Sequence, residues 1–303
     1  MNSSQAVKLD WNLVQYFLAV VDHGAVARAA EATGVSQPTL SRQIAALEAA
    51  IGAVLFTRST RGSMLTDIGE ALVGPAREMQ EAAHKLHLAI KGQSQSLVGT
   101  VRISASEMVC VYLLPSILGE LRKSHPDIQI EVLANNAQDN LLQGEADIAV
   151  RMVQPSQDTL VARHLGGLKL GAYATRDYMQ NKGSELSMHN VAAFDWIGYD
   201  KNDIVLRGMR QLGMPMTRES FSLRSDNDMV RWHALLEGLG IGFEFEVLAQ
   251  RHQELVRVMP PNAIPSIPVW LTAPQELRSN PRIRVVFDHL ADHLSQLTNR
   301  TRE

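Results

Sequence analysis

Residues 25–51 have the sequence AVARAAEATGVSQPTLSRQIAALEAAI, and this stretch decides the fold of the N-terminal part of the chain. It predicts two short helices around a tight turn at Gly34, because glycine adopts the backbone conformation that ends a helix. Ser36 is a preferred N-cap for the second helix, and Pro38 is compatible with its first turn. A second helix that opens with small polar side chains, held at an angle by the first, is typical of helices that enter the DNA major groove.

The flanking segments extend this unit. Residues 12–23 carry apolar side chains at helical spacing and predict a preceding helix. Residues 54–56 and 63–65 predict the strands of a short β-hairpin, and its tip at residues 58–62 is polar and basic. Such a tip can act as a wing that contacts the backbone or the minor groove of DNA.

Residues 67–92 predict a long helix. Its apolar side chains recur at spacings of three and four residues over about three heptads, which is typical of a coiled coil. They are Ile68, Leu72, Ala76, Met79, Ala83, Leu86 and Ile90. We expect this helix to pair two chains, with Pro75 as a candidate kink. The alternative is a helix that packs on its own domain.

The composition is that of an ordinary globular protein, since 45% of the 303 residues are hydrophobic and 20% are charged. No apolar run approaches the roughly 20 residues that span a membrane, and residues 1–12 lack the layout of a signal peptide. We therefore expect a cytoplasmic protein.

Cys110 is the only cysteine, and its apolar neighbours predict a packed position in a core. The ten histidines show no metal-ligand spacing with it. The sequence also lacks a nucleophile elbow, a Walker loop and a dinucleotide-binding glycine motif. We therefore predict no metal, no other cofactor and no enzymatic activity.

The net charge of −3 argues weakly against nucleic-acid binding. The first 66 residues, however, carry five basic and four acidic side chains. Arg42, Arg58 and Arg61 gather on the expected DNA-reading helix and the loop after it. We therefore expect DNA affinity to be local to this face and to be multiplied by dimerisation.

Strand and helix patterns alternate from residue 97 onward. The predicted strands are 97–104, 128–133, 146–151, parts of 161–174, 196–199, 220–223 and 240–245. The predicted helices are 109–124, 176–182, 203–212 and 282–297. This alternation predicts an α/β region with largely parallel sheets, long enough for two halves.

The chain resembles the LysR-type transcriptional regulators over nearly its whole length. The resemblance is most specific at Tyr16-Phe17, Ala29-Ala30, Val35-Ser36-Gln37-Pro38, Leu40-Ser41-Arg42-Gln43-Ile44, Leu47-Glu48, Gly52, Leu55-Phe56, Arg58, Leu65-Thr66 and Gly69. Looser matches follow at residues 144–149, 238–242 and 281–294.

The resemblance implies an α+β multidomain protein with a winged helix-turn-helix at residues 1–66, a dimerising linker helix at 67–92 and an effector domain at 93–303. The effector domain is expected to be a two-lobed α/β structure like the periplasmic binding proteins. Lobe I would span residues 97–162 and 267–303, and lobe II residues 163–266. Such regulators usually form homodimers or homotetramers, bind double-stranded promoter DNA, hold a small-molecule effector between the lobes and affect RNA polymerase.

Two departures from the family pattern concern function. Ala25 and Val26 follow Gly24 where the family often has Ser and an aromatic residue, so a capping interaction worth about 1 kcal/mol is missing. Residues 243–246, Phe-Glu-Phe-Glu, stand where the family commonly has an apolar pair and Pro. Because Glu244 is added and Pro is missing, the pocket chemistry of the family does not transfer directly to this position.

The candidate DNA contacts lie on the second helix and the wing. Gln37 can bond a base edge, preferably adenine, Pro38 and Thr39 can meet thymine methyl groups, and the arginines can reach phosphate, guanine or the minor groove. The full set is Ser36, Gln37, Pro38, Thr39, Ser41, Arg42, Arg58 and Arg61. The alternative for each arginine is an exposed, solvated charge.

The candidate effector contacts lie where strands end and helices begin, which is where open α/β sheets bind ligands. They are Ser104, Ser106, Arg151, Tyr199 and Asp226. The alternatives are that Ser104 and Asp226 only cap helices and that Arg151 pairs with a surface acid. Ser104 and Arg151 favour an anionic ligand, whereas Glu107 and Glu244 favour a zwitterionic or cationic one, and the sequence leaves both open.

Two other functions compete with a DNA-binding regulator. A solute-binding protein would explain residues 97–303 but leaves the first 92 residues without a role. An enzyme that uses Cys110 or a serine is not supported by any catalytic motif in the chain.

Overall fold

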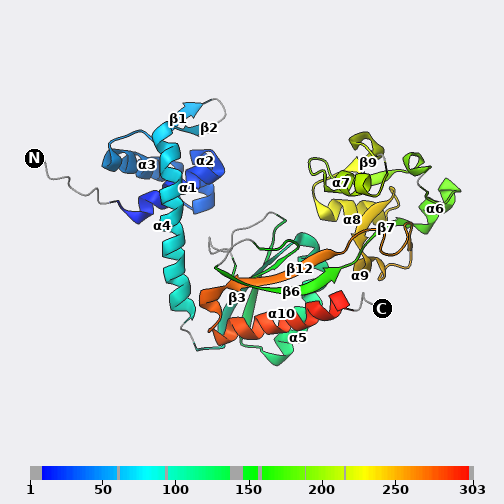
Figure 1. Cartoon of the computed structure of the whole chain (residues 1–303). Coiled ribbons are helices and arrows are strands. Elements are labelled where there is room, and N and C mark those ends of the chain that lie inside the picture. Colours follow the sequence, from blue (N-terminus) through cyan, green and yellow to red (C-terminus); the bar gives the residue numbers. More distant parts are fainter. Residues whose placement is uncertain are drawn as a thin grey trace, which may run out of the picture. The chain divides into compact units, whose positions relative to one another are not determined.

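The computed structural model describes residues 9–59, 62–92, 95–136, 146–155, 159–187, 189–214 and 216–299, with the main chain alone at 58, 59 and 299. The described chain forms two compact units that divide between His87 and Leu88. Figure 1 shows the elements of both units along the chain.

The first unit holds three short helices, a hairpin and most of a long helix. These elements are α1 (Trp11–His23), α2 (Val26–Thr33), α3 (Gln37–Ile51), β1 (Phe56–Ser59), β2 (Gly62–Leu65) and α4 (Asp67–Gly92). The predicted turn is confirmed, because Gly34 ends α2 in the left-handed conformation and Ser36 caps α3. The apolar faces of α1, α2 and α3 meet in one core around Phe17, Leu18 and Leu40.

The hairpin of β1 and β2 lies against the turn between α1 and α2. The amide of Ser63 donates to the carbonyl of Gly24 at 3.1 Å. Gly62 has a φ of +128°, and a Cβ atom at this position would lie 2.5 Å from that same carbonyl oxygen. The position therefore requires glycine both for its backbone conformation and for space.

Helix α4 is continuous over 26 residues, across Pro75. Leu72, Val73 and Ala76 pack on the core of the first unit. Other residues of the predicted seam are open to solvent, with exposed fractions of 38% for Met79, 66% for Leu86 and 67% for Ile90. Part of this apolar seam is therefore left exposed by the residues that the structure describes.

The second unit contains a five-stranded sheet with helices on it, which we call lobe I. Its elements are β3 (Gly99–Ala105), η1 (Val109–Leu113), α5 (Leu114–Ser124), β4 (Ile128–Ala134), β5 (Ile148–Arg151), β6 (Leu160–Leu168), β12 (Ile267–Pro274), η5 (Gln275–Leu277) and α10 (Pro281–Asn299). The strand order is β4-β3-β5-β12-β6. Figure 1 shows α5 and α10 along the sheet that holds β3, β6 and β12.

The rest of the second unit, which we call lobe II, has two smaller sheets, of order β10-β7-β11 and β8-β9. Its elements are β7 (Leu170–Thr175), α6 (Arg176–Lys182), η3 (Val191–Ala193), β8 (Trp196–Gly198), α7 (Ile204–Gln211), η4 (Arg218–Ser220), β9 (Phe221–Arg224), α8 (Asp228–Leu236), β10 (Gly242–Phe245), α9 (Glu246–Ala249) and β11 (Leu255–Arg257). The chain enters lobe II after β6 and returns through β12.

The expectation of largely parallel sheets is wrong. β3 is parallel to β4 and β5, but β12 is antiparallel to both β5 and β6, and β7 is antiparallel to β10 and β11. The five-stranded sheet is mixed because β12, which the sequence patterns did not predict, is antiparallel to both of its neighbours. The sheet of β7, β10 and β11 is antiparallel throughout, and β11 was also not predicted.

The predicted helix at 109–124 is correct in extent but not uniform. Its first five residues, Val109–Leu113, form a π-helical turn in which the amide of Leu114 donates to the carbonyl of Val109. Pro115 follows at the start of α5 and has no amide hydrogen, so the regular α pattern cannot continue through it.

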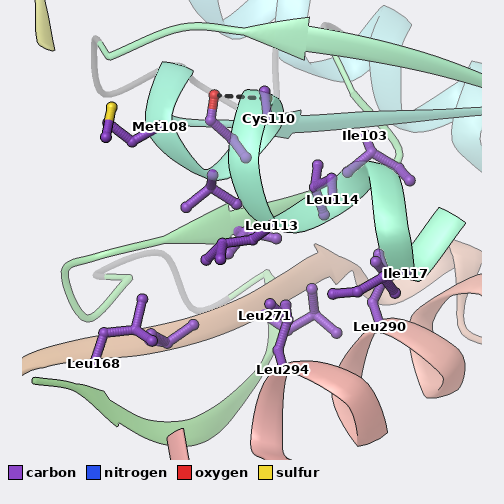
Figure 2. Close-up of a cluster of buried hydrophobic side chains, with 14 of the residues drawn as sticks. Ile103, Met108, Cys110, Leu113, Leu114, Ile117, Leu168, Leu271, Leu290 and Leu294 are labelled. Atoms are coloured by element: carbon purple, nitrogen blue, oxygen red, sulfur yellow. Dashed lines mark hydrogen bonds between the residues drawn. The ribbon is translucent and has the colours of Figure 1, made fainter. Parts of the chain in front are cut away.

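One apolar core runs through lobe I and into lobe II. Figure 2 shows Leu290 and Leu294 of α10 beside Leu271 of β12 and Ile117 of α5. Cys110 lies in this core, so its predicted packed position is confirmed. Burial raises the pKa of the Cys110 thiol, which disfavours the nucleophilic thiolate.

We predict that Gly62→Ala destabilises the first unit by roughly 1–3 kcal/mol, because the added methyl group meets a main-chain carbonyl at a strained φ. Calorimetric unfolding of the full chain should show a lower transition temperature for this unit. Gly74→Ala is the matched control, since nothing lies within 4 Å of its added Cβ, and alanine favours a helix interior. Equal transition temperatures for the two variants would contradict this account of the wing.

Candidate DNA-reading surface and effector site

The outward face of α3 carries the predicted DNA contacts. Gln37, Pro38, Ser41 and Arg42 are exposed, whereas Leu40, Ile44 and Leu47 are buried on the opposite face. These polar residues occupy the first two turns of the helix, where a recognition helix meets base edges.

Ser36 and Thr39 also stabilise the start of α3. The Thr39 amide donates to Ser36 Oγ at 3.3 Å, and the two hydroxyl oxygens lie 2.8 Å apart. Their hydroxyl groups are therefore engaged within the protein, although Ser36 remains exposed.

Acidic side chains of the first unit are tied into its structure. The Glu48 carboxylate accepts from the amides of Leu55 at 2.7 Å and Phe56 at 3.4 Å, and Asp10 caps α1. Asp22 forms an ion pair with Arg77 of α4. These three acids therefore have partners within the first unit. The sequence count alone did not indicate these partners.

The wing arginines are described only in part. Arg58 lies in β1, opposite Ser63 of β2, and only its main chain is described. Arg61 lies outside the described residues.

Among the predicted effector contacts, the structure brings Ser104 and Arg151 together. Ser104 lies in β3 with an exposed fraction of 1%, and Arg151 ends the neighbouring strand β5. The guanidinium donates to Ser104 Oγ at 3.1 Å, to the Ser104 carbonyl at 3.3 Å and to the Val150 carbonyl at 3.2 Å. Ser104 therefore does not cap the following helix, and Arg151 donates to main-chain carbonyls.

Ser106 is half-buried in the turn after β3, where its carbonyl accepts from the Cys110 amide. The next residue, Glu107, contacts lobe II. Its carboxylate accepts from Asn227 Nδ2 at 3.2 Å, and Asn227 is the N-cap of α8. A hydrogen bond thus joins the two lobes beside the turn of Ser104 and Ser106, where the sequence predicts effector contacts.

Tyr199 and Asp226 both lie in lobe II, where Asp226 accepts hydrogen bonds from a loop and Tyr199 contacts an arginine. The carboxylate of Asp226 accepts from the amides of Asp200 at 3.1 Å and Lys201 at 3.0 Å, so it holds a loop. These bonds lower the pKa of Asp226, with the Lys201 amide as the largest contribution. The alternative that Asp226 caps the next helix is wrong, because Asn227 is that cap. Tyr199 lies under the guanidinium of Arg231, 3.5 Å from its ring centroid.

A buried acid in lobe II was not among the predicted contacts. Glu244 in β10 has an exposed fraction of 7%, and its Oε1 accepts from the amide of Phe245 at 2.7 Å. Burial raises the pKa of Glu244 to about 8; the Phe245 amide opposes this, Asp228 adds to it and Arg231 reduces it. The sequence signal was the departure from the family pattern at this position.

Within the described ranges, no group of three or more His, Cys, Asp or Glu side chains is placed to hold a metal ion. None of the described helices combines the length and hydropathy needed to cross a bilayer.

Two family models match this chain. Residues 11–70 match the bacterial regulatory helix-turn-helix proteins of the lysR family, and residues 94–295 match the LysR substrate binding domain. The HTH-type transcriptional regulator PtxR of Pseudomonas aeruginosa is 28% identical over 295 residues, which covers 95% of this chain and 94% of PtxR.

Solved structures share the fold. The full-length virulence activator AphB of Vibrio cholerae aligns with a TM-score of 0.62 at 20% identity, over 94% of this chain and 99% of AphB. Full-length CbnR, solved in a complex with its target DNA, aligns with a TM-score of 0.57 at 19% identity, over 94% of this chain and all of CbnR (100%).

We predict that Glu244→Gln stabilises the chain more at pH 8 than at pH 5. The raised pKa means that Glu244 favours folding at low pH, and this contribution is lost as the pH rises from about 4.5 to about 8. Glutamine does not ionise, so its advantage should grow to a few kcal/mol over this range, on the order of 1.4 kcal/mol per pH unit.

Melting temperatures at pH 5, 6.5 and 8 would measure this. The groups that interact electrostatically with Glu244 are Asp228 and Arg231 of α8, Tyr112 of η1, Tyr173 of β7 and Tyr199. Glu237→Gln, at an exposed position, is the matched control. A difference between Glu244→Gln and wild type that does not change with pH would contradict the prediction.

Proposed function

The chain belongs to the family of LysR-type transcriptional regulators, which join a DNA-binding helix-turn-helix to an effector-binding domain, and we propose that it acts on promoter DNA as a homodimer or homotetramer. A small molecule held between lobes I and II would change the geometry of the assembly, and with it the access of RNA polymerase. We place this action in the cytoplasm and assign the chain no catalytic reaction.

The observation that carries the proposal is that α3 buries one face in the core and exposes the other. Gln37, Ser41 and Arg42 face outward on a helix whose other side is fixed in the core. In the proposal Gln37 reads a base edge, Pro38 and Thr39 meet thymine methyl groups, and Ser41 and Arg42 bond base or phosphate. Ser36, Arg58 and Arg61 complete the contact surface on DNA.

We propose the domain boundaries at residues 1–66, 67–92 and 93–303. The linker helix is the proposed dimer contact because Met79, Leu86 and Ile90 leave an apolar seam exposed on α4. For the effector, we propose a site between the two lobes. Ser104, Ser106 and Arg151 would line it from lobe I, and Tyr199 and Asp226 from lobe II.

We predict that Gln37→Ala weakens binding to the duplex that the wild-type chain enriches from a random pool. The expected loss is roughly 5–150-fold, equivalent to about 1–3 kcal/mol for a bidentate base contact. Binding to an unrelated duplex should not change, because phosphate contacts remain. Fluorescence anisotropy at fixed salt measures both, with Gln129→Ala, an exposed position in lobe I, as the control. An equal loss on both duplexes would exclude a base-reading role for Gln37.

We predict that Leu86→Glu weakens chain pairing, because a charge enters the apolar seam of α4. Leu86 is 66% exposed, so the fold of each chain should be preserved. Light scattering coupled to size-exclusion chromatography should show a smaller assembly than wild type at the same concentration. Lys85→Glu, on an exposed neighbouring position, is the matched control. An unchanged mass for Leu86→Glu would rule out α4 as the dimer contact.

A further inference from the structure

Glu244 is a largely buried acid with one hydrogen bond to the main chain. Its exposed fraction is 7%, and its Oε1 accepts from the amide of the next residue. Among the residues that the structure describes, no donor bonds its second oxygen and no cation lies within ion-pair distance of it. Burying an acid in this way is costly, so such groups are rare unless they serve a ligand or reaction.

Arginines of both lobes bond to groups other than Glu244. Arg231 forms an ion pair with Asp228, donates to the Ser225 carbonyl and lies on the ring of Tyr199. Arg257 pairs with Glu246 at 2.6 Å and bonds the Tyr173 hydroxyl at 2.7 Å. In lobe I, Arg151 donates to main-chain carbonyls. Each of these arginines therefore has more than one bonding partner, whereas Glu244 has one hydrogen bond among the described residues.

An aromatic ring lies beside this acid, because Tyr173 covers Gly171, the residue that pairs with Glu244. Burial raises the pKa of Tyr112, Tyr173 and Tyr199, and the Glu244 charge raises it further, which places all three phenols within its electrostatic reach. Tyr112 belongs to η1 of lobe I and packs edge-on against Trp232 of α8, with ring centroids 5.9 Å apart. Acidic oxygen next to aromatic rings is the chemistry that recognises an organic cation.

The register of β10 explains how Glu244 reaches this position. Glu244 pairs with Gly171 of β7, which has no side chain of its own. The ring of Tyr173, two residues further along the same face, lies over Gly171. The opposite face belongs to Phe243, which stacks on Trp196. The carboxylate therefore lies on the side of the sheet where α8 and Tyr112 are.

We propose that the effector of this chain carries a protonated amine and that Glu244 is the residue that recognises it. This inference rests on the proposed function, in which the effector binds between the lobes. A compact ammonium group fits a carboxylate with little exposed surface better than a broad guanidinium does. Glu107, held by Asn227 across the lobes, is a second acid that can bond a further polar group of the ligand.

The test is a thermal-shift and calorimetric titration of the full chain with aliphatic compounds of three to six carbons. The panel holds diamines and amino acids, with the diols and dicarboxylates of matched length as neutral and anionic probes. We expect stabilisation by at least one amine and not by its diol. Glu244→Gln should raise the Kd for that amine at least roughly thirty-fold, whereas Glu237→Gln should leave it unchanged.

Titration in buffers of different ionisation enthalpy adds an independent readout. Glu244 is expected to lose its proton when the cation binds, so wild type should release protons at pH 7 and Glu244→Gln should not. Glu244→Gln is expected to be at least as stable as wild type, so weaker binding cannot be ascribed to unfolding.

Three outcomes would overturn the inference. They are a panel from which no amine stabilises the chain, stabilisation by carboxylates or diols alone, and amine binding that Glu244→Gln leaves intact. None of these results would contradict the proposed action on promoter DNA, which is tested separately by sequence-specific DNA binding.

Discussion

The DNA-reading surface depends on the burial of one face of α3. Leu40, Ile44 and Leu47 fix the helix against α1 and α2, so its polar residues cannot turn inward. Gly34 and Ser36 set where the helix begins, and Glu48 ties its far end to β1. A rigid helix with a preorganised outer face loses little conformational entropy when it binds DNA.

A second constraint organises the effector domain. β6 and β12 pair antiparallel from Ile267↔Leu168 to Pro274↔Leu160, and both strands lead between lobe I and lobe II. The two lobes share one apolar core and are joined by hydrogen bonds such as that between Glu107 and Asn227. A ligand that contacts both lobes would add to these bonds and so favour one arrangement of the lobes.

Local patterns predicted the elements that local chemistry specifies. The bounds of α3 and α6 follow from caps and glycines at Ser36, Thr175 and Gly183, which the sequence shows directly. The direction of β12 cannot be predicted from such local signals. It depends on pairing with strands about a hundred residues earlier, and the periodicity of the sequence does not report this pairing.

The candidate site was harder to predict than the fold, for the same physical reason. A sequence shows that Ser104 ends a strand, but not that Arg151 from another strand bonds it. It places Asp226 near a helix, but the loop amides that it accepts from lie more than twenty residues earlier in the chain. Glu244 stood out as a departure from the family pattern and as an acid that favours a cationic ligand, but its burial depends on α8 and on the strand opposite.

The most direct measurement is selection of DNA by the full-length chain from a random-sequence duplex pool. We expect enrichment of a common sequence with two related half-sites, since a paired assembly presents two α3 helices to the DNA. Binding should weaken steeply with salt while the preference for that sequence remains. A pool that stays random after repeated selection, at salt concentrations that permit binding, would contradict the claim that α3 reads sequence.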